Sequence, residues 1–390
     1  MHPKFLILQL SIIIVSYNVR SYLHTCLLAL QAATDPSRTE IIVIDNASAD
    51  GTVDLLEPLF PGIRFVRNTH NTGFAVANNQ GLALAGGEYV LLLNPDTLVT
   101  RESLSHPMRL LASSEKTAAV GVRMINGYGL FLPESKRSLP DFWGACCKLT
   151  GLAALFPRSA FFNRYALGHL DALSEYPVAV LAGAYMMLRR DALQQVGGLD
   201  EGFFMYGEDI DLCRRLQDAG YDIWYTGKTP ILHFKGKSSR KGSMVQVKLF
   251  YAAMARYVRK YHHFPWLTLP LVYLREALAL CWHLIPLHPK SEPVLEEQNS
   301  CYLGHPDSLA SWLHFAGIRQ CATISGLLTD TEIVENVKKQ RPKHLIINLE
   351  TFPIERVLPL MQVFPGMNTC FFVPSRQLFT GNGRFPQKHL

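Results

Sequence analysis

Three acidic side chains lie within four positions of the chain, Glu208, Asp209 and Asp211. An aromatic run precedes them and apolar residues at helical spacing follow, so we expect an amphipathic helix that begins at these acids and stops near Gly220. Acidic residues in a first helical turn commonly cap free amides and complement the helix dipole. The alternative is catalytic, with one carboxylate projecting into a cleft as a general base. The other polar residues of the chain must decide between the two interpretations.

Polar side chains also follow the apolar segments that we expect to form buried strands. The expected strands cover residues 11–15, 40–44, 63–66 and 89–93, and the expected helices between them cover 20–33, 50–60 and 74–85. This alternation predicts a parallel sheet covered on both faces, which collects ligands at the carboxyl ends of its strands. The polar residues at these ends are Ser16, Tyr17, Asn18, Asp45, Asn46, Ser48, Asn94 and Asp96. Their convergence favours a binding site over isolated turn residues.

Composition and missing fingerprints exclude several function classes. No G-x-G-x-x-G follows the first strand and no G-x-x-x-x-G-K-[ST] occurs, which argues against a dinucleotide oxidoreductase and a P-loop NTPase. The net charge of +6 indicates a mild attraction to phosphates or anionic lipid, and no basic stripe interleaved with aromatics predicts nucleic-acid binding. The eight cysteines show no C-x-x-C or zinc spacing, which is typical of buried thiols in a reducing cytosol.

The chain of 390 residues predicts more than one folding unit. We expect a first domain over residues 1–245, a helical segment over 246–290, and a small Rossmann-like α/β domain over 299–390 that serves binding or assembly. Residues 264–287 are strongly apolar, yet Arg275 and Glu276 lie in their middle, so a membrane span would be costly. We expect this segment to lie in a membrane interface, and packing on the protein's own surface stays open.

The motifs taken together resemble a known family. They are residues 11–18, 45–52, 71–74, 92–96 and 207–209, with Gly183 and His233. In this order they resemble an inverting family-2 glycosyltransferase, closest to the rhamnosyltransferase-like branch, over residues 10–262. The resemblance implies the GT-A nucleotide-diphospho-sugar transferase fold, an α/β fold with a mixed, mainly parallel sheet between helices. The helical segment and the small Rossmann-like domain would follow it.

On the donor side, the resemblance implies binding of a dTDP- or UDP-sugar with a divalent metal, Mg²⁺ or Mn²⁺. The family's Asp-x-Asp corresponds to residues 94–96 here, where Asn94 replaces the first acid, so Asp96 keeps the only carboxylate. His233 would complete the metal shell, or else act as a structural hydrogen bonder. The residues expected to bind the nucleotide sugar are Ser16, Tyr17, Asn18, Asp45, Asn46, Ser48, Asn71, Gly73, Phe74, Asn94 and Gly183. Asp45 would read the nucleobase, and Gly73 with Phe74 would let the backbone approach the nucleotide.

On the acceptor side, the resemblance assigns the catalytic base to Asp209, with Glu208 and Asp211 in support. The sugar, rhamnose or a similar hexose, would pass to a hydroxyl of a lipid-linked or cell-surface polysaccharide precursor. We therefore expect a cytoplasmic enzyme with peripheral contact to the inner face of the membrane and no nucleic-acid partner. A glycosidase with paired carboxylates is disfavoured by the nucleotide-type strand ends. The alternative is a non-catalytic nucleotide-sugar sensor, which would need no base at position 209.

Overall fold

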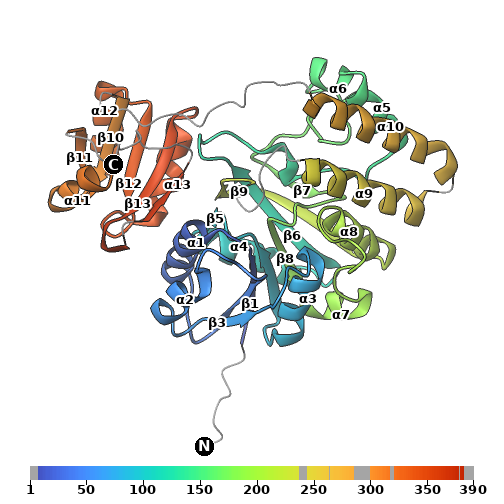
Figure 1. The fold of residues 1–390 in the computed structure, drawn as a ribbon, viewed down its shortest axis with the longest axis horizontal. Helices are drawn as coiled ribbons and strands as arrows, with labels where there is room; N and C mark the ends of the chain where they lie inside the picture. Colours follow the sequence, from blue (N-terminus) through green and yellow to red (C-terminus); the bar gives the residue numbers. More distant parts are fainter. Residues whose placement is uncertain are drawn as a thin grey trace, which may run out of the picture.

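The computed structural model describes residues 8–236, 244–262, 264–284, 299–316, 320–376 and 378–381. Its first part alternates strands and helices as the sequence predicts (Figure 1). The elements are β1 (Leu10–Ser16), α1 (Arg20–Ala33), β2 (Thr39–Asp45), α2 (Thr52–Leu56), β3 (Arg64–Arg67), α3 (Phe74–Leu84) and β4 (Tyr89–Leu93). Helix α2 is shorter than expected because Pro58, which has no amide hydrogen to donate, lies in a tighter turn that ends it.

The second part adds the elements that complete the first sheet. They are β5 (Thr97–Leu98), α4 (Arg101–Ala112), β6 (Thr117–Ile125), α5 (Phe142–Leu149), α6 (Leu152–Leu155), β7 (Glu175–Pro177), β8 (Tyr185–Arg189), α7 (Arg190–Val196), α8 (Glu208–Asp218) and β9 (Asp222–His233). Strand β9 is one long strand that includes both Tyr225 and Ile231.

Within the described residues, this sheet has the strand order β3-β2-β1-β4-β8-β6-β9-β5, with β7 paired to β9. The first four strands run parallel, and β8 enters antiparallel to both β4 and β6. Ser16 lies opposite Asp45, and Ile14 lies opposite Leu93, so the segments that follow β1, β2 and β4 leave the sheet at one edge. The predicted class, an α/β fold with a mixed sheet between helices, is confirmed.

Strand β1 lies in the interior of this sheet, and its side chains are buried on both faces. Ile12 and Ile14 pack into a core with Leu23 and Leu27 of α1, whereas Ile13 belongs to the core of the opposite face. Because successive side chains of a strand point to opposite faces, only a continuous apolar run can occupy such a position. The strand ends are therefore held by two packed layers.

Two long helices follow the sheet, α9 (Met244–Tyr261) and α10 (Pro265–Leu284). They lie beside α8 and α5 (Figure 1). No helix among the described residues is long and apolar enough to cross a bilayer. Helix α10 nevertheless exposes large apolar side chains, among them Trp266, Leu274 and Leu278.

The last part of the chain forms a second, smaller sheet. Its elements are β10 (Ser300–Gly304), α11 (Leu309–Ala316), β11 (Ala322–Ser325), α12 (Asp330–Gln340), β12 (His344–Asn348), α13 (Ile354–Val363), β13 (Asn368–Val373) and β14 (Leu378–Thr380). The described strands have the order β11-β10-β12-β13-β14, parallel except for β14. This Rossmann-like layout agrees with the sequence. Its core continues into the first part, where Leu232 and Phe234 pack with Phe371, and the unit lies beside α1 (Figure 1).

Candidate active site

The ends of β1 and β2 form the first wall of the candidate site. The amide of Ser48 donates to Asp45 Oδ2 at 2.9 Å, and the amide of Asn18 donates to Ser48 Oγ at 2.9 Å. Asn18 Oδ1 in turn accepts from the Ala49 amide at 2.7 Å. Within the described chain, Asp45 Oδ1 and Ser16 Oγ are buried and have no hydrogen-bond partner. Since buried polar atoms are normally paired, these two atoms favour a ligand at this edge.

Tyr17 stands between these residues in sequence and is 36% exposed. A partly exposed aromatic ring suits contact with a flat ligand such as a nucleobase. Ser16, Asn18, Asp45 and Ser48 lie together where β1 and β2 end, and Tyr17 follows Ser16 in the chain. Their contact with a nucleotide stays a prediction.

The segment before α3 is held by side-chain amides. Asn46 Nδ2 donates to Asn71 Oδ1 at 2.9 Å and to the Gly73 carbonyl at 3.1 Å. Gly73 has φ of +88°, and a Cβ there would lie 2.6 Å from the carbonyl oxygen of Phe204. The Phe74 amide donates to that same oxygen at 2.7 Å. The close backbone approach expected toward the nucleotide is thus observed toward Phe204, which ties this segment to the aromatic run before α8.

Asp96 and His233 come together where β4 and β9 end. Antiparallel pairing sets Thr97 opposite His233, and Asp96 Oδ1 lies 3.4 Å from His233 Nε2. Both side chains are buried, and His233 Nδ1 has no hydrogen-bond partner in the described structure. A carboxylate and an imidazole suit Mn²⁺ or Mg²⁺ when donor phosphates and water supply the other ligands. Among the described residues no third His, Cys, Asp or Glu joins them, so that part of the chain offers two candidate ligands.

Asn94 connects the metal-side strand end to the segment before β8. Its amide donates to the carbonyl of Ala184 at 3.0 Å, and its own carbonyl accepts from Thr97 Oγ1 at 2.8 Å. The next residue along, Gly183, donates its amide to Asp209 Oδ2 at 3.2 Å. Asp209 therefore stands at the same edge of the sheet as Asn94.

Asp209 is held in a defined orientation at the first turn of α8. Besides the Gly183 amide, Arg137 Nη2 donates to Asp209 Oδ2 at 2.6 Å, and the Ile210 amide donates to Oδ1 at 2.8 Å. The Asp209 side chain is 13% exposed. These three donors hold the Asp209 carboxylate in one orientation at the edge of the sheet.

Arg137 is the residue of this site that the sequence analysis did not identify. Burial alone would lower the pKa of its guanidinium, but the neighbouring Asp209 carboxylate and Tyr165 raise it above its ordinary value. Arg137 Nη2 also donates to the Leu181 carbonyl at 2.8 Å. The sequence shows only a basic residue in a long irregular segment, 72 positions before Asp209, and no spacing rule links the two.

Glu208 lies next to Asp209 but in a different environment. Its side chain is buried, and Oε2 has no hydrogen-bond partner within the described residues. Burial, with the Asp209 charge adding to it, raises the pKa of Glu208 to about 8. Glu208 is therefore largely protonated at neutral pH, which supports a role as a neutral neighbour and not as a second base.

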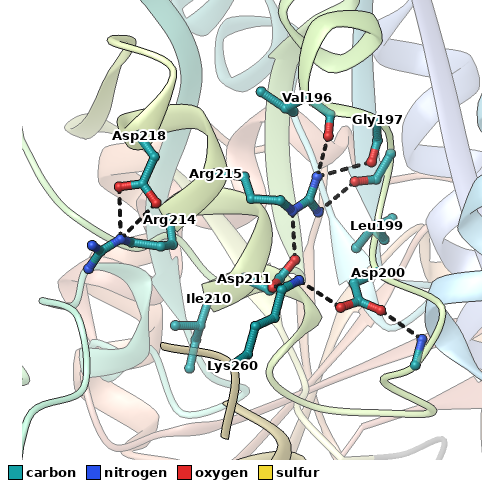
Figure 2. A network of polar contacts seen from close by, with 12 residues as sticks. Val196, Gly197, Leu199, Asp200, Ile210, Asp211, Arg214, Arg215, Asp218 and Lys260 are labelled. Carbon is teal, nitrogen blue, oxygen red and sulfur yellow. Dashed lines mark hydrogen bonds and ion pairs between the residues drawn. The ribbon is translucent and has the colours of Figure 1, made fainter. Parts of the chain in front are cut away.

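Asp211 belongs to an interior network that joins α8 to α9 (Figure 2). Its Oδ2 accepts from Arg215 Nε at 2.8 Å, and its Oδ1 accepts from Lys260 Nζ at 2.6 Å and from Tyr261 Oη at 2.7 Å. Lys260 also pairs with Asp200 at 2.7 Å. The Asp211 side chain is fully buried and every contact it makes is structural, so it supports the site by fixing α8.

Comparisons with known proteins indicate the family to which the chain is similar. The family "Glycosyl transferase family 2" matches residues 11–197, and "Glycosyl transferase family group 2" matches residues 153–314. The N-acetylglucosaminyl-diphospho-decaprenol L-rhamnosyltransferase of Mycobacterium tuberculosis is 27% identical over 288 residues, which cover 71% of this chain and 92% of that protein. The rhamnosyltransferase WbbL of Escherichia coli is 28% identical over 236 residues, 59% of this chain and 84% of WbbL.

Solved structures give a weaker likeness. The mannosyltransferase PcManGT from Pyrobaculum calidifontis, in complex with GDP-Man and Mn²⁺, aligns with a TM-score of 0.48 at 18% identity. The alignment covers 72% of this chain and 76% of PcManGT.

Proposed function

Because the chain belongs to glycosyl transferase family 2 and is a glycosyltransferase, we propose that it moves rhamnose or a similar hexose from a nucleoside diphosphate to a lipid-linked glycan precursor, with inversion. One observation supports this most. Buried atoms of Ser16, Asp45 and His233 that lack partners among the described residues stand at the ends of β1, β2 and β9, and Asp209 borders the end of β4. An anionic sugar nucleotide would give these buried atoms their hydrogen-bond partners, and Asp209 would face the acceptor.

On the donor side, we assign the nucleobase to Asp45 and the diphosphate to the region of Asp96 and His233. Asp45 Oδ1 is a free acceptor for a base N–H, and Ser16 Oγ is a donor and acceptor beside it. Asp96 and His233 would hold a divalent cation, which when bound neutralises the charge that collects on the leaving diphosphate. With Asn94 in place of a second carboxylate, metal binding depends on the donor phosphates for most of its ligands.

On the acceptor side, we assign proton removal to Asp209 Oδ1 or Oδ2 during in-line attack by the acceptor oxygen. Arg137 and the Gly183 amide hold this carboxylate in place through hydrogen bonds to Oδ2. The acceptor oxygen loses its proton to the carboxylate as it bonds to the anomeric carbon, in a transition state in which the sugar carries positive charge.

A lipid-linked acceptor is supported by the relatives and by the surface of the protein. The mycobacterial relative is named for a diphospho-decaprenol substrate, and the two rhamnosyltransferases together support the sugar. Exposed apolar side chains on α10, such as Trp266 and Leu274, would suit peripheral contact with the inner face of the membrane.

The test is a transfer assay with a panel of donors, dTDP-rhamnose and UDP-sugars first, with Mg²⁺, Mn²⁺ or EDTA. We expect nucleoside diphosphate release that needs metal and a lipid-linked acceptor, and a product whose anomeric configuration is inverted by NMR. Asp96→Asn should lose metal stimulation, whereas Asp330→Asn, an exposed acid on α12, should not. Failure of every donor in the panel, or a retained anomeric configuration, would refute the proposal.

A further inference from the structure

We propose that the cavity between α5, α9 and α10 binds the phosphate group and the adjoining hydrocarbon of the lipid-linked acceptor. This rests on the proposed function and deepens it by assigning residues to the acceptor. The cavity measures about 230 Å³. Its walls are largely apolar, and they include Phe250, Met254, Val258, Leu271 and Val272. A hydrocarbon chain gains stability in such a lining because it leaves water.

Two cations line the same cavity, Lys148 of α5 and Arg275 of α10. Neither forms an ion pair with a carboxylate of the described residues. Desolvation lowers the pKa of Lys148, and the positive charges of Arg137, Arg275 and Lys235 lower it further, so these cations lie near one another. Arg137 and Lys235 have carboxylate partners, Asp209 and Glu134, whereas Lys148 and Arg275 have none among the described residues. An anion would compensate these two cations, and a phosphate supplies several acceptor oxygens.

The one carboxylate in the lining does not neutralise this cluster. Asp141 caps α5 by accepting from the Gly144 amide at 2.6 Å, and its other oxygen pairs with Arg164 at 2.8 Å. Its charge is already compensated. The cavity therefore combines an apolar wall with a net positive edge, which matches an amphiphile with a phosphate head and matches neither a neutral lipid nor a free sugar.

Hydrogen bonds also connect the lining of the cavity to the proposed base. Tyr165 lines it, and Arg137 Nη1 donates to Tyr165 Oη at 3.4 Å. Arg137 Nη2 at the same time donates to Asp209 Oδ2. Tyr165 and Arg137 therefore connect the lining of the cavity to Asp209, which would place the sugar attached to a bound phosphate on the side of the base.

The surroundings of the cavity favour a lipid from a membrane as its occupant. Phe142 lines it and is 46% exposed, and Trp266, Leu274 and Leu278 of α10 are more than half exposed. Large apolar side chains around a cationic apolar cavity let an acyl or isoprenoid chain pass from a bilayer without crossing water.

The test uses calorimetric titration of the full chain, in EDTA so that no metal binds, with three probes: farnesyl diphosphate, farnesol and inorganic diphosphate. We expect farnesyl diphosphate to bind roughly tenfold or more tightly than either half alone, because both the charged and the apolar contacts are then made. Arg275→Gln should weaken farnesyl diphosphate roughly tenfold. Val272→Trp, which fills the cavity, should weaken farnesyl diphosphate and leave inorganic diphosphate unchanged.

Arg158→Gln is the matched control, since Arg158 is an exposed cation near α6 that does not line the cavity. Equal binding of farnesyl diphosphate by wild type, Arg275→Gln and Val272→Trp would overturn the inference, as would farnesol or inorganic diphosphate binding as tightly as the amphiphile. The proposed function fails separately: a wild-type protein that binds farnesyl diphosphate as expected but releases no nucleoside diphosphate from any donor would refute transfer and leave the cavity assignment standing.

Discussion

Asp209 and Asp211 stand two positions apart on α8 and have opposite surroundings. Both accept from an arginine, Arg137 and Arg215 respectively. Two helical positions differ by about 200° in direction, so one side chain turns toward the sheet edge and the other toward α9. Asp209 is partly exposed and its arginine comes from a distant segment, whereas Asp211 is fully buried and its arginine is on its own helix.

The difference teaches which carboxylate is able to do chemistry. Both oxygens of Asp211 are engaged by the cations Arg215 and Lys260 (Figure 2). Oδ1 also accepts from a tyrosine, and the side chain is fully buried, so Asp211 is closed to a substrate. Asp209 is held by one guanidinium and by amides at an edge where other polar atoms lack partners in the described structure. Position in an acidic run therefore says less about function than the partners that each acid acquires in the fold.

Asp209→Asn tests the functional half of this comparison and should have the largest effect. The amide keeps the contact with Arg137 but cannot accept the acceptor proton, so the transfer rate should fall by about 10²- to 10⁴-fold. Donor binding, followed by nucleotide titration, should change little. Transfer within a few-fold of wild type would remove Asp209 from the role of base and would reopen the comparison.

Asp211→Asn tests the structural half. It leaves Lys260 and Arg215 without their common anion, and breaking such a pair should lower the free energy of unfolding by about 3 kcal/mol, which is measured by urea denaturation. The folded fraction should still bind donor nucleotide. A variant with unchanged stability and no transfer would instead mean that Asp211 takes part in the reaction.

Local patterns in the sequence predicted most helices and strands well. Helix α1 begins and ends at the expected residues because apolar periodicity is a local signal. The antiparallel direction of β8 in the middle of the sheet was not expected, because strand order is decided by contacts between distant segments.

The residues of the candidate site also divide into those that local sequence patterns predict and those that only the fold brings together. Strand ends and an acidic helix start are local signs, so Asp45, Asp96 and Asp209 were found as candidates. Arg137 was missed because its importance depends on a contact across 72 positions. The acidic run alone does not separate Asp209 from Asp211, since both are acids in one helical turn, and the resemblance supplied that assignment. The contact of Asp211 with α9 shows that Asp211 is enclosed.

Glu208, beside Asp209, predicts how the stability of the protein changes with pH. In the unfolded chain its pKa is near the ordinary 4.5, while in the folded protein it is about 8. Below pH 4.5 both states hold the proton, and between these values only the folded state does, so rising pH removes stability. We expect the free energy of unfolding of the wild type to fall by about 2 kcal/mol between pH 5 and pH 7, measured by urea denaturation at each pH. Glu208→Gln should abolish this fall. Parallel pH profiles for the two proteins would contradict a buried, protonated Glu208.

Arg214→Ala is the smallest expected change and provides the control for the ion pairs of α8. Arg214 Nε lies 2.9 Å and 3.0 Å from the two oxygens of Asp218, but both side chains are well exposed. Water screens such a pair, so its loss should cost no more than about 0.5 kcal/mol. Arg215→Ala, one position along, removes the buried contact with Asp211 together with hydrogen bonds to the carbonyls of Val196 and Gly198, and should cost several times more in the same urea titration. Equal losses of unfolding free energy in the two variants would mean that burial does not make the Arg215–Asp211 pair more stabilising than the Arg214–Asp218 pair.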